Sequence, residues 1–302
     1  MQWFWIALAA PAIWAVVNHI DKYIISRYFT GRGVGSLVIF TSLSGLIFSI
    51  FILLFNYSSL TFGLADAVLI AFNGALLVAS FIPYLYALEK EEASIISTLF
   101  QTIPVFVYFL ALFFLREVLS AKQIFSSLLI IAGAIIISLD LSVKVRFKMK
   151  PFLLMLLSSF MIAVNVLIFK IIALKENFWG TAFWEYIGGA IFGLILFSFI
   201  RLYRRQFLAT IAKSRLMVLG LNTLSEILNI IAKLLANFAS LLAPLTLVLV
   251  VNGFQPLIVF IYGIFITLFL PKIGKETLTK KVIIQKIIAI IIIFIGAYNL
   301  LK

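Results

Sequence analysis

Residues 117–141 read EVLSAKQIFSSLLIIAGAIIISLDL, a short charged turn followed by an apolar run long enough to span a membrane as a helix. The turn has the pattern Glu-x-Leu-[Ser/Thr]-x-Lys, which recurs at residues 276–281. An apolar run follows both copies, with Gly133-Ala134 in the first and Gly296-Ala297 in the second. Self-similarity at such a long spacing predicts a duplicated fold.

Two further pairs of segments repeat in the same order along the chain. Asn18 and Asn165 end similar tetrapeptides, and Pro104 and Pro256 each lie near a glutamine in the middle of an apolar segment. The spacing between the matched residues rises from 147 for the asparagines to 163 for the two Gly-Ala pairs. The ordered matches predict two five-helix repeats, at residues 1–143 and 150–302.

The composition places most of the chain in lipid. It has 302 residues, of which 64% are hydrophobic and 12% charged, whereas soluble domains are about 45–50% apolar and about 25% charged. A soluble enzyme, a disulfide scaffold and a disordered protein are therefore excluded. The absence of cysteine and the single histidine, His19, exclude a thiolate or multi-histidine metal site, and no cofactor is expected. Residues 1–5 carry no positive charge, so no removable signal peptide is expected.

Ten apolar segments of about 20 residues predict an all-α polytopic membrane protein. They are residues 3–24, 35–55, 64–88, 93–115, 123–141, 152–174, 181–200, 216–236, 241–270 and 282–301. Because five is odd, the second repeat enters the membrane in the opposite sense to the first. Ten transmembrane helices in two inverted repeats are typical of secondary transporters, which bind their substrate at mid-depth between the repeats.

The repeated segments also resemble a known family. Residues 117–133, with the Pro104 helix before them, are similar to the signature region of EamA-type domains in the drug/metabolite transporter superfamily, and residues 276–296 are similar to its second copy. The resemblance implies a ten-helix carrier that works by alternating access. The second copy departs from the family pattern at residues 270–274, where a shorter turn is usual. In both copies, the hydroxyl residue of the turn can cap the next helix, and the glycine favours close helix packing.

Polar residues at membrane depth are the candidate site, because lipid disfavours them unless they face protein or water. Asn222, Glu226, Asn229 and Lys233 share one helical face. We consider two interpretations of Glu226. It either pairs with a lysine such as Lys170 or Lys22, or lines a transport cavity and binds substrate or a proton.

Further amides and one aromatic residue complete the predicted cavity. The candidate substrate-binding residues are Trp14, Asn18, Asn73, Gln101, Asn165, Glu226, Asn229, Asn252 and Gln255. Pro104 and Pro256 are candidate hinges or kinks, because each would remove a helical hydrogen bond. An interfacial position is expected for Glu185 and Tyr186. This chemistry suits a small polar or zwitterionic metabolite.

The net charge of +13 is distributed unevenly over the predicted connections. One side has six of the 24 basic residues, Arg116, Lys122, Lys170, Lys175, Lys233 and Lys302, and the other side has the remaining 18. The positive-inside rule places those 18 in the cytoplasm and both termini outside, whereas relatives of the family generally have both termini inside. The predicted location is the inner or plasma membrane.

Other functions remain as alternatives to a metabolite transporter. A flippase for a lipid-linked or phosphorylated amphiphile would need a lateral opening and a basic site. An intramembrane enzyme is disfavoured by the single histidine, and a channel by the lack of a filter-like repeat. The expected partners are a small-molecule substrate and the lipid bilayer, and not nucleic acid. A monomer and a homodimer are both compatible with the sequence.

Overall fold

The computed structural model describes residues 2–28, 33–90, 96, 99–139, 148–213, 216–269 and 280–301. Within these residues the chain is helical without strands, and nine helices are long and apolar enough to cross a membrane. The protein is therefore an all-α, multi-pass integral membrane protein. The fourth predicted span, at residues 93–115, extends beyond the described residues, and its described part is the shorter apolar helix Phe100–Phe114.

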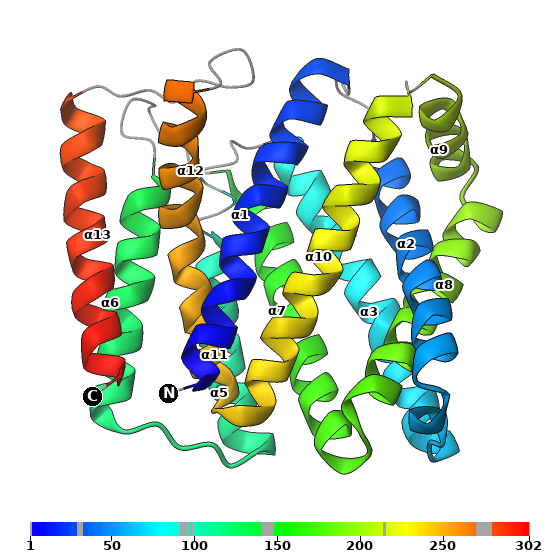
Figure 1. Ribbon diagram of the computed structural model, residues 1–302, viewed down its shortest axis with the longest axis horizontal. Coiled ribbons are helices and arrows are strands. Elements are labelled where there is room, and N and C mark those ends of the chain that lie inside the picture. The colour runs from blue at the N-terminus through cyan, green and yellow to red at the C-terminus, as the bar shows by residue number, and fades with distance from the viewer. Residues whose placement is uncertain are drawn as a thin grey trace.

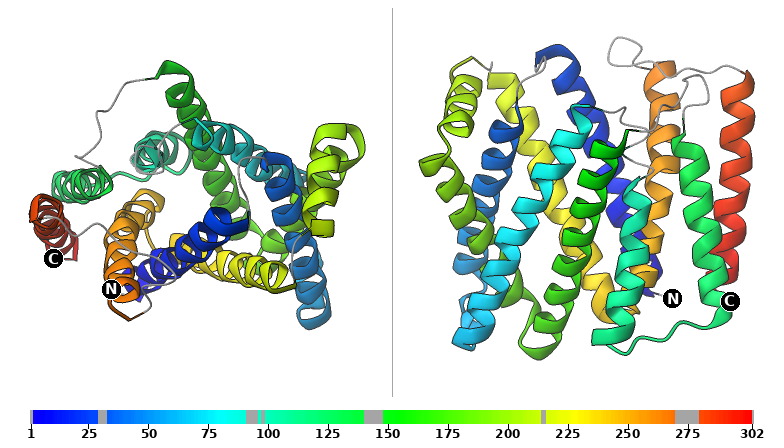
Figure 2. Two further views of the ribbon diagram at one scale, coloured as in Figure 1. Left: turned by 90° about the horizontal axis from the view of Figure 1, so that it is seen from above. Right: turned by 180° about the vertical axis from the view of Figure 1, so that it is seen from behind.

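The helices in the first half of the chain are α1 (Gln2–Tyr28), α2 (Val34–Phe55), η1 (Tyr57–Leu60), α3 (Leu64–Leu88), η2 (Phe100–Thr102), α5 (Ile103–Phe114) and α6 (Ala121–Ser138). Those in the second half are α7 (Met149–Lys175), α8 (Phe178–Phe199), α9 (Arg201–Lys213), α10 (Leu216–Leu242), α11 (Leu245–Val251), η3 (Asn252–Phe254), α12 (Gln255–Phe269) and α13 (Lys280–Leu301). Both termini lie at one end of the bundle, and we call this end the terminal end (Figure 1). The turns that follow α5, α7 and α10 lie at the same end (Figures 1 and 2).

Helices α6 and α13 pack side by side at one edge of the bundle (Figure 2). A Cβ on Gly133 would lie 2.5 Å from Cγ1 of Ile293, and a Cβ on Gly296 would lie 2.8 Å from Cγ1 of Ile130. Only glycine permits this approach, which confirms the packing role predicted for the two Gly-Ala pairs. Ser120 also caps α6 as predicted, since its Oγ accepts the backbone N–H of Gln123 at 3.2 Å. Thr279 and the rest of the second turn, except the backbone of Lys280 and Lys281, lie outside the described residues.

Pro104 and Pro256 occupy positions in their helices that differ from those predicted from the sequence. Pro104 lies in the first turn of α5, directly after η2, and Pro256 lies in the first turn of α12, directly after η3. The predicted span 241–270 is consequently divided into α11, η3 and α12. A proline in the first turn removes no internal helical hydrogen bond. Both prolines lie within longer helical runs, Phe100–Phe114 and Leu245–Phe269, and what differs from the prediction is the 3-10 turn directly before each proline.

Helix α9 was predicted as a connection between spans. It packs against α2, where the side chain of Gln206 accepts the backbone N–H of Gly35 at 3.0 Å. The hydroxyls of Tyr203 and Tyr86 are 3.1 Å apart. Burial, with the bond to Tyr86, raises the pKa of the Tyr203 phenol, so the phenol is neutral at physiological pH. This helix was not predicted from the sequence, because α9 is short and basic and only part of its surface is apolar.

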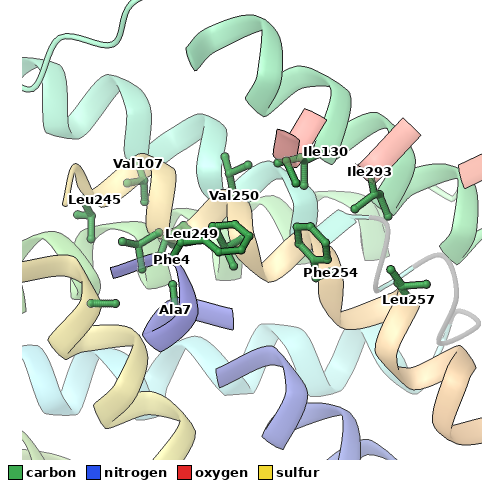
Figure 3. Close-up of a cluster of buried hydrophobic side chains, with 14 of the residues drawn as sticks. Phe4, Ala7, Val107, Ile130, Leu245, Leu249, Val250, Phe254, Leu257 and Ile293 are labelled. Carbon is green, nitrogen blue, oxygen red and sulfur yellow. The ribbon is translucent and has the colours of Figure 1, made fainter. Parts of the chain in front are cut away.

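The largest apolar core joins the two halves of the chain (Figure 3). Phe4 and Val107 come from the first half, and Leu249, Phe254 and Ile293 from the second. All five are buried, and they surround the break between α11 and α12. The predicted repeats therefore share one core.

Candidate functional site

A buried polar cluster joins α3, α7, α8 and α10, and we call it the amide–carboxylate junction. It consists of Asn73, Asn165, Glu185 and Lys233. Oε1 of Glu185 accepts Nδ2 of Asn165 at 2.8 Å and Nδ2 of Asn73 at 3.3 Å. Its other oxygen, Oε2, accepts Nζ of Lys233 at 2.6 Å. The Glu185 side chain is only 1% exposed, so this carboxylate is stabilised by its ammonium and amide donors rather than by solvent.

The two asparagines also bond to each other reciprocally. Nδ2 of Asn73 donates to the backbone oxygen of Asn165 at 3.0 Å, and Nδ2 of Asn165 donates to the backbone oxygen of Asn73 at 3.1 Å. Both amide orientations are fixed, because a flipped amide would place its oxygen against a carbonyl and a carboxylate. The Oδ1 atoms of both residues are buried and have no hydrogen-bond partner among the residues that the structure describes. The junction is therefore rigid.

Glycines bring α3 and α8 together beside this junction. A Cβ on Gly74 would lie 1.8 Å from the backbone oxygen of Glu185, and a Cβ on Gly188 would lie 1.8 Å from that of Ala71. The two backbones are thus in direct contact at Glu185 and over the helical turn that follows it. Small residues at such crossings allow helices to approach closely within membranes.

A second carboxylate, Glu226, lies on the same polar face of α10 as Lys233. Its Oε1 accepts the Thr41 hydroxyl from α2 at 2.7 Å. The adjacent Ser225 donates to Oδ1 of Asp21 on α1, also at 2.7 Å. Glu226 and Lys233 are seven residues apart, or about 10 Å along the helix axis.

The predicted pairing of Glu226 with Lys170 was wrong. Nζ of Lys170 is 2.5 Å from Oε1 of Glu117, and it also donates to the backbone oxygen of Ala243 at 2.8 Å. The other Glu117 oxygen accepts the backbone N–H of Leu245, the first residue of α11, at 2.7 Å. The side chain of Lys22, the other lysine considered, lies outside the described residues.

The contacts of Glu117 and Lys170 hold the two halves together at the terminal end. Glu117 belongs to the first half, whereas Lys170 and Leu245 belong to the second. A second ion pair, Lys175–Asp66 at 2.6 Å, also joins the halves at this end. Lys175 is the last residue of α7, and Asp66 lies in the first turn of α3.

The predicted site residues are only partly brought together. Asn73 and Asn165 meet in the junction, whereas Asn18 is exposed and Trp14 packs near Ala10, Ala232 and Ala236. Gln101, Asn229, Asn252, Gln255 and Pro256 are half-buried, and Pro104 is buried. Oδ1 of Asn252, at the break between α11 and α12, is buried and finds no hydrogen-bond partner in the described ranges. His19 bonds to the backbone oxygen of Val259 on α12 at 3.0 Å.

The sequence prediction missed the importance of Glu185, which is buried rather than interfacial. Helix α8 begins at Phe178, so Glu185 lies two turns inside it. Gly188 and Gly189 follow in the next turn, and both are buried. A carboxylate beside small residues in an apolar helix was the available signal, because such residues face neighbouring helices rather than lipid.

Comparisons with known proteins support the class of protein that this architecture defines. The model of the EamA-like transporter family matches residues 1–139, the region of the first predicted repeat. This match confirms the resemblance of that region to EamA-type domains, is consistent with the drug/metabolite transporter superfamily, and indicates a membrane transporter. No curated protein matches the chain. A solved structure described as "Crystal structure of protein" is 15% identical, covers 99% of this chain and 95% of its own, and has a TM-score of 0.66, so it shares the fold.

Proposed function

We propose that the protein is a secondary transporter for a small polar or amphiphilic metabolite, which it moves across the bilayer by alternating access. The polar face of α10 is the main support. It presents Glu226 toward α2 and Lys233 toward α8 through direct side-chain bonds. Ionisable groups inside a membrane bundle are costly to bury and commonly mark a transport pathway. The family match is in accord with this function.

An inverted repeat of five helices accounts for the order of the helices. The 3-10 turns η2 and η3 begin at Phe100 and Asn252, and are separated by the same 152 residues as the two prolines. The tripeptide Gly-Leu-Ile occurs in α2 from Gly45 and in α8 from Gly193, with an offset of 148 residues. These offsets fit between the values of 147 and 163 that bracket the repeats. The repeat therefore pairs α2 with α8 and α3 with α10.

Alternating access is supported by unequal contacts between equivalent helices. Helices α3 and α8 pack along much of their length, whereas α2 and α10, their proposed counterparts, share a short contact that includes the Thr41–Glu226 bond. In addition, Glu117 and Lys170 join the two halves at the terminal end. We infer that this conformation is closed at the terminal end and that transport requires those contacts to break.

The uneven charge supports an orientation for this cycle. We propose that the connections opposite the terminal end are cytoplasmic, because they and their flanks include 18 of the 24 basic residues. The inner or plasma membrane is the proposed location.

Flux into proteoliposomes tests the proposed function. The full chain is reconstituted, and a panel of labelled polar metabolites, including amino acids, is assayed for uptake and for exchange. We expect saturable flux for a subset of compounds and a strong loss in Glu226→Gln. The matched control is Glu89→Gln, which removes the same charge from an exposed position at the end of α3. Equal flux in wild type and Glu226→Gln would remove Glu226 from the pathway.

A flippase is the second candidate, and one observation favours it. The short contact between α2 and α10 would allow access from the bilayer, and α9, with Arg201, Arg204 and Arg205, packs against α2. A basic helix at this position suits a phosphorylated head group. Translocation of a fluorescent phosphorylated lipid, measured by dithionite quenching, distinguishes this candidate from a metabolite carrier.

A further inference from the structure

The two carboxylates beside the polar face of α10 differ in their partners. Glu185 binds an ammonium, that of Lys233, together with two amides. Glu226 binds the hydroxyl of Thr41, and among the described side chains it has no ion pair. A carboxylate inside a membrane bundle is costly to leave without a positive partner. Glu226 therefore has the chemistry of an incomplete ion pair.

The proposed repeat relates the surroundings of these two groups. Asn73 of α3 and Asn222 of α10 are separated by 149 residues, which fits the rising offsets of the other matched residues. As a pair of helices, α2 and α10 are then the counterpart of α3 and α8. The carboxylate on the α3–α8 side has an ammonium partner, which Lys233 of α10 provides. The α2–α10 side has the carboxylate and a hydroxyl, so a ligand ammonium would complete it.

Tyr186 is an independent sign of a ligand. It follows Glu185 in α8, and its ring packs against α2, where a Cβ on Gly45, one turn from Thr41, would lie 3.0 Å from its Cδ1. The Tyr186 hydroxyl is buried, and within the described part of the chain it has no hydrogen-bond partner. The Tyr186 ring already accepts a cation, because Nζ of Lys233 lies 5.2 Å from its centroid. An ammonium near Glu226 would meet an unused hydroxyl oxygen and the same aromatic residue.

The negative charge at this level is reinforced from α1. Asp21 is bonded to Ser225, which is next to Glu226 in sequence. The hydroxyls of Ser225 and Thr41 are neutral donors, so they orient the carboxylates without neutralising them. Two carboxylates with neutral partners favour a positively charged ligand over an anion.

We propose that Glu226, Thr41 and Tyr186 form a binding site for a primary ammonium group of the transported substrate. This inference rests on the proposed transport function and narrows the substrate class to amines and amino-group zwitterions. The ammonium donates hydrogen bonds to the Glu226 carboxylate and the Tyr186 oxygen. Thr41 holds the carboxylate in place from α2. No covalent step is involved.

Propylammonium chloride is the probe, and the purified full-length chain is the sample. Thermal unfolding is followed by intrinsic tryptophan fluorescence at increasing probe concentration, with sodium chloride and sodium propionate at equal concentration as salt controls. We expect propylammonium alone to raise the Tm of wild type and of Glu89→Gln. In Glu226→Gln the concentration needed for half of the effect should rise roughly tenfold or more, because a charge-assisted hydrogen bond is lost.

Conservative variants separate binding from folding. Thr41→Ser retains the hydroxyl and should bind like wild type, whereas Thr41→Val should bind more weakly. Tyr186→Phe retains the ring and removes only the hydroxyl oxygen, so it should also weaken binding. These variants test the same site if Glu226→Gln does not fold.

Two outcomes would overturn the proposal. One is a wild type that propylammonium does not stabilise, and the other is equal stabilisation of wild type and Glu226→Gln. If Glu226 instead takes up only a proton, the unliganded wild type will show a pH-dependent Tm that Glu226→Gln lacks, without any effect of propylammonium. Saturable flux of metabolites without an amino group, together with no propylammonium binding, would leave the transport function standing and remove this inference. Propylammonium binding that depends on Glu226, in a protein that shows no flux, would support the ammonium site and remove the transport function.

Discussion

Replacing Lys233 by methionine should destabilise the protein strongly, because it leaves the Glu185 carboxylate buried without its cation. The ammonium lies 2.6 Å from the carboxylate, whose side chain is 1% exposed. Removing one partner of a buried pair typically costs about 3–5 kcal/mol. Part of that loss is avoided if Glu185 takes up a proton, so we expect a decrease of about 3 kcal/mol in the free energy of unfolding.

The double variant Glu185→Gln/Lys233→Met should recover much of this loss. Glutamine can still accept the amide hydrogens of Asn73 and Asn165 through its Oε1, and no unpaired charge remains. Replacing both members of a buried ion pair is often neutral. A double-mutant cycle over Glu185→Gln, Lys233→Met and the double variant should therefore give a coupling energy of about 2–3 kcal/mol.

The assay is equilibrium unfolding in mixed micelles of a mild detergent and sodium dodecyl sulfate, followed by far-ultraviolet circular dichroism. Lys175→Met is the matched control, because Lys175 lies at the same 2.6 Å from Asp66 but its side chain is 62% exposed. Solvent screens that pair, so the control should lose much less stability than Lys233→Met. A Lys233→Met variant no less stable than the double variant would refute the reasoning, since Glu185 would then need no cation.

Three further predictions concern packing, gating and orientation. Gly188→Ala should lower the Tm, because its Cβ would lie 1.8 Å from a backbone oxygen of α3. The control Gly220→Ala should leave the Tm unchanged, because no neighbouring atom lies within 4 Å of its Cβ. Equal Tm values for the two variants would contradict the direct helix contact. The chain has no cysteine of its own, so Asn229→Cys provides a single site for an impermeant maleimide applied at the terminal end. Adding Lys170→Met should speed this labelling. An unchanged rate would show that Lys170 does not restrict access. A C-terminal alkaline phosphatase fusion should be active in intact cells, and an inactive fusion with a fluorescent cytoplasmic reporter at the same position would reverse the orientation.

The sequence was sufficient to predict nine of the ten spans within the described residues, because hydropathy over about 20 residues depends on composition and not on tertiary contacts. The breaks at η2 and η3 were not predicted, since apolar residues continue through both of them. Proline alone did not locate them, because it is equally compatible with a first turn and with a kink. The repeated position of Pro104 and Pro256 was the useful signal, although it was interpreted as a hinge inside a helix.

The candidate site was predictable in its residue types and not in its partners. Helical periodicity correctly placed Glu226 and Lys233 on one face of α10. The carboxylate partner of each lysine depends on which helices lie close together in the fold, and those helices are far apart in sequence. Lys170 pairs with Glu117 and Lys233 with Glu185, and among the described side chains Glu226 bonds to Thr41. These contacts depend on the α3–α8 crossing, for which the sequence offered only a few glycines.

The rigidity of that crossing restricts how alternating access can occur in this protein. Direct backbone contact at Gly74 and Gly188, together with the hydrogen bonds of Glu185, makes separation of α3 from α8 expensive. These helices should therefore move as one body. The Glu117–Lys170 contact instead depends on a few polar bonds between a turn, a helix and the start of α11. Opening of the terminal end should consequently begin at Lys170. Lys170→Met should increase accessibility there and also lower stability, because the Lys170 side chain is only 6% exposed.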